Sequence, residues 1–197
     1  MKIDNNIIEQ RQNVKFLGVF IDENLNWKHH IKIISGKIAR SVGILSKSKF
    51  FLSKSSLIKL YYTLIYPYLY YGNIVWGSTY PTTLDRLNVL HKRAIRIITM
   101  SNFDAHTAPL FYENKLLNLK HINNYQTGTF MYRFHNKLLP KSFQNMFELN
   151  SNIHSLLLGM QSTIDPTFVE LILKKFLFYL KAHIFGTHSL PTHSKQI

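Results

Sequence analysis

The sequence predicts a mainly α-helical protein, with a helical bundle that follows an N-terminal β-hairpin. Two observations indicate this class. The hydrophobic pattern changes near Trp27, from short runs of β-branched and aromatic residues to apolar residues at helical spacing. Proline and capping residues then divide the rest of the chain into segments of helical length. Hydrophobic residues make up 46% of the 197 residues, which is enough to bury a core and excludes disorder for most of the chain.

The first segment is predicted to be β structure. Residues 2–9 and 14–22 are rich in β-branched and aromatic residues, and the second run has apolar residues on both faces, so part of it should be covered twice. Gly18, in the middle of this run, marks a bulge or a close backbone approach. Turn chemistry follows from Asp22, and Asn26 can cap the helix that comes next.

An amphipathic helix with a basic outer face is predicted from Trp27 onward. Its apolar residues recur at helical spacing, and its basic residues lie off that stripe. The stripe consists of Trp27, Ile31, Ile34, Ile38, Val42 and Leu45.

Five more helices are predicted downstream. The second helix begins near Ser53 or Ser55, and Pro67 kinks or ends it. The third is capped by Thr82 or Thr83 and carries Asp85 in its first turn. The others are expected at residues 109–117, where proline suits the first turn, and at residues 119–138, and a further one is expected at residues 168–185.

The stretch from Leu60 to Trp76 contains no charged residue and is about as long as the shortest membrane span. Pro67, Gly72 and six tyrosines oppose a membrane position, because tyrosine favours an interface over a hydrocarbon centre. We therefore interpret the stretch as a buried aromatic helix pair and expect no membrane partner. The alternative is a membrane-associated helical protein built on this stretch and residues 176–185.

Basic residues are concentrated in one part of the chain. The sequence has 24 Lys and Arg against 10 Asp and Glu, a formal net charge of +14. Residues 26–100 contain twelve of the basic residues and one acidic residue, Asp85. A surface made for solubility alone mixes the two signs, so this segment predicts a surface for phosphate. The alternative is a protein that is basic without a specific partner.

The absence of cysteine excludes disulfide partners, thiolate metal sites and cysteine nucleophiles, and it suits an intracellular setting. The first residues lack the apolar core of a signal peptide. The protein is therefore expected in the nucleus or cytoplasm and is not expected to be secreted.

No catalytic site or cofactor is predicted from the residues themselves. A nucleotidyl transferase needs paired carboxylates for two metal ions, and only Asp22 and Glu23 are close in sequence. Adjacent strand residues point to opposite faces, so these two are interpreted as a turn at the end of a strand. The histidines are weak metal candidates without a third strong ligand and are interpreted as surface residues. They are the pair His29 and His30 and the trio His183, His188 and His193.

Several ordered blocks carry a resemblance to a known family. They are residues 15–22, 25–27, 30–31, 60–62, 66–72, 75–78, 92–98, 106–111 and 152–155. Each block alone is weak, but their order over residues 1–155 is a strong signal. The chain resembles the region just downstream of the catalytic motifs in the reverse transcriptases of jockey-like non-LTR retrotransposons.

This resemblance implies a domain organisation. Residues 1–24 would be a palm-edge hairpin that corresponds to the primer grip. Residues 25–150 would form a helical, thumb-like bundle with a connection region, and residues 151–197 a diverged tail. The family's catalytic aspartates would lie upstream of Met1. The chain is therefore expected to be a truncated fragment of an RNA-directed DNA polymerase, inactive alone, whose parent enzyme uses Mg²⁺.

In that parent enzyme the chain would hold the RNA/DNA primer–template duplex. The residues expected to contact nucleic acid are Phe16, Leu17, Gly18, Lys28, Lys32, Arg40, Lys92, Arg93 and Arg96. Basic helices can follow a nucleic-acid backbone through phosphate contacts. The alternative is a stand-alone, non-enzymatic basic domain that binds nucleic acid. Without a palm beside it, the hairpin is also expected to cause self-association unless the helices cover it.

Overall fold

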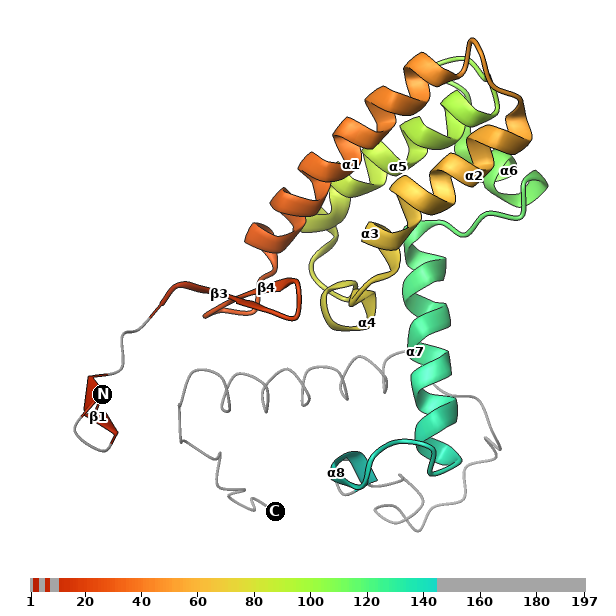
Figure 1. Ribbon diagram of the computed structural model, residues 1–197. Helices are drawn as coiled ribbons and strands as arrows, with labels where there is room; N and C mark the ends of the chain where they lie inside the picture. The colour runs from red at the N-terminus through yellow and green to blue at the C-terminus, as the bar shows by residue number, and fades with distance from the viewer. Residues whose placement is uncertain (1, 4–5, 8–10, 145–197) are drawn as a thin grey trace, which may run out of the picture.

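Short strands precede a set of helices, which confirms the predicted fold class (Figure 1). The computed structural model describes residues 2–3, 6–7 and 11–144. The first strands, β1 (Lys2–Ile3) and β2 (Asn6–Ile7), pair with each other. A second antiparallel pair follows, formed by β3 (Asn13–Phe16) and β4 (Val19–Asp22). The helix expected at residues 168–185 lies outside the described residues.

The run at residues 14–22, which was predicted to be β structure, contains the tight turn between β3 and β4. Leu17 and Gly18 both have positive φ angles, 45° and 84°, and Phe16 pairs with Val19 across them. Two successive residues with positive φ are typical of the tight turns that match the twist of paired strands. Of the two expectations for Gly18, a bulge or a close backbone approach, the bulge is wrong, because Gly18 lies in the turn between β3 and β4. Its conformational freedom serves to reverse the chain.

Helix α1 (Lys28–Ser48) confirms the predicted amphipathic helix, and all six residues of the predicted stripe are buried. The helix starts after Trp27, whose φ angle of 62° turns the chain. The expected cap at Asn26 is therefore displaced by one residue, because Trp27 is the N-cap, although Oδ1 of Asn26 still accepts a hydrogen bond from the backbone N–H of Lys28 at 3.0 Å.

The uncharged stretch forms parts of three helices, α2 (Lys54–Leu64), α3 (Tyr66–Tyr70) and α4 (Asn73–Trp76). Ser53 caps α2 as predicted, and the helix ends before Pro67, which lies in the first turn of α3. Burial is only partial, because Tyr61 and Trp76 are fully enclosed while Tyr62 and two other tyrosines are exposed. No helix in the described part of the chain is long and apolar enough to cross a membrane.

Helix α5 (Pro81–Ile98) begins earlier than predicted. The expected threonine cap is wrong, because Tyr80 is the N-cap residue and Asp85 lies beyond the first turn. Proline at the first helical position explains the difference, since it has no N–H to satisfy and its φ is already helical. The remaining helices among residues 11–144 are α6 (Thr107–Glu113), α7 (Leu119–His135) and α8 (Lys141–Gln144).

Helices α1 and α5 lie side by side and run in the same direction, while α2 returns alongside them (Figure 1). A buried pair joins α2 to α5, because the Tyr61 hydroxyl lies 2.8 Å from Nε2 of His91 and the two rings stack. Both side chains are completely enclosed by the core. Burial raises the pKa of Tyr61 and lowers that of His91 to about 3. This pair is therefore a neutral structural contact.

Candidate nucleic-acid interface

The parallel pair of α1 and α5 carries a strongly basic surface. Helix α1 has no acidic residue in its 21 residues, and α5 has only Asp85. Among the predicted site residues on these helices, five are exposed and one, Arg96, is half-buried. The exposed ones are Lys28, Lys32, Arg40, Lys92 and Arg93.

A depression of about 370 Å³ lies between the first turns of the two helices. Lys28 and Lys32 reach it from α1, and Arg86 reaches it from α5. The other lining residues are Ile31, Ser35, Thr82 and Thr83. Three cations beside two threonines form a surface that suits phosphate oxygens.

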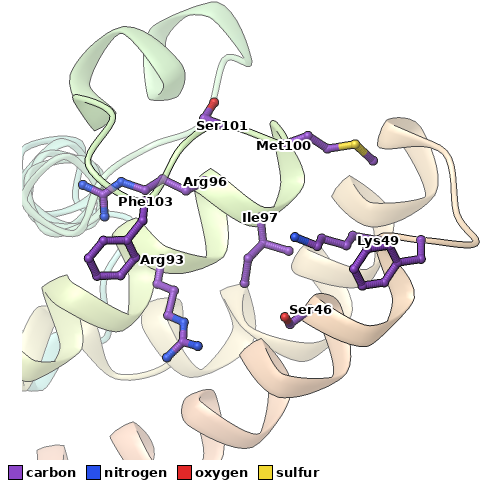
Figure 2. A pocket seen from close by; sticks show the side chains of 9 residues that line it. Ser46, Lys49, Arg93, Arg96, Ile97, Met100, Ser101 and Phe103 are labelled. Atoms are coloured by element: carbon purple, nitrogen blue, oxygen red, sulfur yellow. The ribbon is translucent and has the colours of Figure 1, made fainter.

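A second depression, of about 390 Å³, lies between the last turns of the same helices (Figure 2). Arg93 and Arg96 from α5 meet Lys49 from the end of α1. The remaining lining residues are Ser46, Phe50, Ile97, Met100, Ser101 and Phe103. The two depressions therefore mark the two ends of one basic surface, and only this second one has aromatic residues in its lining.

The predicted basic residues divide into three groups. Lys28 and Lys32 lie together at the first depression, and Arg93 and Arg96 lie at the second. Arg40 and Lys92 are exposed on the same helices, but neither lines a depression. Arg96 also has a structural task, because its Nε donates a hydrogen bond to the backbone carbonyl of Ala105 at 2.9 Å.

The tip of the β3–β4 hairpin is held against the junction of α3 and α4. The hydroxyl of Tyr71 donates a hydrogen bond to the carbonyl of Leu17 at 2.6 Å. A Cβ atom on Gly72 would lie 3.1 Å from Cγ2 of Val19, so a larger residue there would crowd the hairpin. Phe16 and Leu17 are 50% and 74% exposed. These two side chains are therefore accessible to a ligand, while the backbone of the tip is fixed.

Transposon proteins of Drosophila melanogaster match the chain. The probable RNA-directed DNA polymerase from transposon X-element is 26% identical over 136 residues, which cover 66% of this chain and 14% of that protein. The RNA-directed DNA polymerase from mobile element jockey is 26% identical over 104 residues, covering 50% of this chain and 11% of that protein. The probable RNA-directed DNA polymerase from transposon BS is 25% identical over 105 residues, with the same coverage of 50% and 11%.

The chain is related to the reverse transcriptases of jockey-like non-LTR retrotransposons. It spans between 11% and 14% of the length of these relatives. No protein-family model matches the chain, and no solved structure does.

In this relative of the retrotransposon reverse transcriptases, Asp22 serves as an internal cap. Its side chain is buried, and its two oxygens accept hydrogen bonds from three backbone N–H groups. Oδ1 lies 3.2 Å and 3.0 Å from the nitrogens of Asn24 and Asn26, and Oδ2 lies 2.8 Å from that of Trp27. The interpretation of Asp22 as a turn residue is confirmed.

The histidines of this reverse-transcriptase relative do not form a metal site within the described residues. His30 is buried, contrary to the surface position expected for it, and its Nδ1 accepts a hydrogen bond from the backbone N–H of Phe20 at 3.3 Å. Burial, with His29 and Lys37 nearby, lowers the pKa of His30 to about 4. Within residues 11–144, no three His, Asp or Glu side chains are grouped to hold a metal ion. The trio of His183, His188 and His193 lies outside the described residues.

Four residues that line the two depressions are absent from the predicted contact residues. Arg86 could have been found, because it lies two helical turns before Arg93 and therefore on the same side of α5. Lys49 completes the second depression only through the packing of α1 on α5. Phe50 and Phe103 follow no helical period, so no sequence pattern marks them.

Proposed function

We propose that the α1/α5 surface holds the primer–template duplex of an RNA-directed DNA polymerase. The observation that carries this proposal is the placement of cations at both ends of one parallel helix pair, with a single acidic residue in the two helices. Such a surface contacts the phosphate backbone, and contacts of this kind do not depend on the base sequence. The Drosophila relatives are named as RNA-directed DNA polymerases, so the expected ligand is a primer–template duplex.

The length of the surface fits a duplex. Lys28 and Ser46 line the two depressions from one helix, and at about 1.5 Å rise per residue they are ~27 Å apart along its axis. In B-form DNA one strand advances about 3.4 Å per nucleotide, so the surface spans roughly eight nucleotides of such a duplex. A rigid pair of helices of this length can bind several consecutive phosphates at once.

Changing Lys28, Lys32 and Arg86, which line the first depression, to alanine is expected to weaken binding to a blunt RNA–DNA hybrid and to reduce its salt dependence. Each phosphate contact contributes about −0.9 to the slope of log K against log salt, so the slope should become less negative by up to about 2.7. The measurement is fluorescence anisotropy with a labelled hybrid over a salt series. All three side chains are exposed, so the circular dichroism spectrum should be unchanged.

The control removes the same charge elsewhere. Lys54, Lys59 and Lys120 are exposed on α2 and α7 and line neither depression. Their replacement by alanine should change the slope much less. Equal slopes for the two triple variants would contradict the proposal and favour a protein that is basic without a specific surface. Equal affinity for hybrid, duplex DNA and duplex RNA would instead favour the stand-alone nucleic-acid-binding domain.

A further inference from the structure

The second depression combines cations with exposed aromatic rings. Phe103 is 85% exposed and Phe50 is 76% exposed, and Met100 beside them is 61% exposed. The other depression has cations and hydroxyl groups but no aromatic residue in its lining. The two ends of the surface therefore offer different chemistry, one for phosphates alone and one for phosphates with an apolar planar group.

Phe103 extends from a braced loop between α5 and α6. Nε of Arg96 bonds the carbonyl of Ala105, and the backbone N–H of Ser101 donates to the carbonyl of Arg96 at 3.0 Å. The hydroxyls of Thr99 and Ser101 lie 2.8 Å apart. These contacts fix the loop on both sides of Phe103. The loop backbone that carries this exposed ring therefore does not have to be ordered when a ligand binds.

The ring and the cations surround one space. Figure 2 shows Phe103 on one side of Ile97 and Lys49 on the other, with Arg93 below them. Nζ of Lys49 lies 5.1 Å from the centre of the Phe50 ring, a cation–π contact that keeps this cation beside an aromatic face. A ligand here meets positive charge and aromatic faces within one depression.

We infer that this depression binds unpaired nucleotides that continue from the duplex. Exposed bases stack on aromatic side chains while cations hold the backbone, and this combination is typical of single-strand binding. In a duplex the bases are stacked on one another and cannot reach Phe103. Phe103 and Phe50 would take the bases, and Lys49 and Arg93 the phosphates. The position of these nucleotides next to a bound duplex rests on the proposed function, whereas the binding of single-stranded nucleic acid does not.

The test compares a blunt RNA–DNA hybrid with hybrids that carry an unpaired extension of about ten nucleotides at either end, and with the free single strand. The wild-type protein should bind an extended hybrid more tightly than the blunt one. Phe103→Ala should reduce affinity for the extended hybrid and the single strand about tenfold, because it removes the surface on which one base stacks. Affinity for the blunt hybrid should stay unchanged.

Two further variants sharpen the test. Phe103→Tyr keeps the ring and should restore binding, and a fluorescent purine analogue in the extension should be quenched by the wild-type protein and by Phe103→Tyr but not by Phe103→Ala. Tyr112→Ala is the matched control, because this ring is 87% exposed on α6 and lies outside the depression. It should leave all affinities unchanged.

The outcomes separate the two proposals. Phe103→Ala with wild-type affinity for every ligand, or with equal losses for blunt and extended hybrids, would overturn the single-strand site and leave the duplex proposal standing. Binding of the single strand that depends on Phe103, with no binding of the blunt hybrid, would uphold the single-strand site and overturn the duplex proposal.

Discussion

Lowering the pH from 7 to 4 is expected to destabilise the helical bundle by several kcal/mol. His30 and His91 are buried, and their pKa values fall from 6.5 to about 4 and about 3. The unfolded chain takes up protons at these histidines near pH 6.5, whereas the folded chain does not until the pH is much lower. The stability that neutral histidines provide is therefore complete above pH 6.5 and falls as the pH decreases. The loss is on the order of 3 kcal/mol per histidine at pH 4.

Urea denaturation followed by circular dichroism over this pH range measures the effect. His91→Gln keeps a polar group near the Tyr61 hydroxyl but cannot be protonated, so its free energy of unfolding should depend less on pH between 6.5 and 4. His121→Gln is the control, because His121 is exposed on α7. Identical pH profiles for His91→Gln and the control would show that His91 is not the source.

Replacing Asp22 by alanine is expected to lower the free energy of unfolding by about 3 kcal/mol or more. Each hydrogen bond to a charged group contributes about 1.5–3 kcal/mol, and the variant leaves three backbone N–H groups without their acceptor. The loss should separate the hairpin from the start of α1. Urea denaturation gives the free energy, and limited proteolysis near residue 24 reports the local opening.

Two variants test the cause of this effect. Asp22→Asn keeps one carbonyl acceptor and should be intermediate. Asp85→Ala removes an exposed carboxylate from α5 and should change the free energy of unfolding by less than about 0.5 kcal/mol. If Asp22→Ala were as stable as Asp85→Ala, the capping role of Asp22 would be wrong.

Helix α1 was predictable because its apolar residues repeat with the helical period over five turns, and all of the predicted stripe is buried. The hairpin was predictable only in outline. A glycine inside an apolar run can mark a bulge or a turn, and only the backbone angles of Leu17 and Gly18 distinguish the two. The start of α5 was predicted wrongly for a similar reason, since Pro81 and the threonines after it are competing signals for a helix start.

The sequence predicts that residues 26–100 are strongly basic, but it does not predict which of their side chains lie together on the folded protein. The periodicity of α1 and α5 assigns Lys28 and Arg93 to outer faces, yet nothing in the sequence says that these helices pack in parallel. Lys28 and Arg86 are far apart in the chain, and they line the same depression only because the two helices pack in parallel. Phe103 depends on the loop after α5, whose shape is set by hydrogen bonds rather than by any periodic pattern.

The common direction of α1 and α5 makes their surface electrically polar along its length. Their N-termini meet at the depression that holds Lys28 and Arg86, and their C-termini meet near Lys49 and Arg93. A helix carries roughly +0.5 of an elementary charge at its N-terminus and −0.5 at its C-terminus, and parallel helices add these dipoles where antiparallel ones would cancel them. The positive potential is therefore strongest at the Lys28 end. An approaching polyanion should engage that end first and reach the aromatic end second.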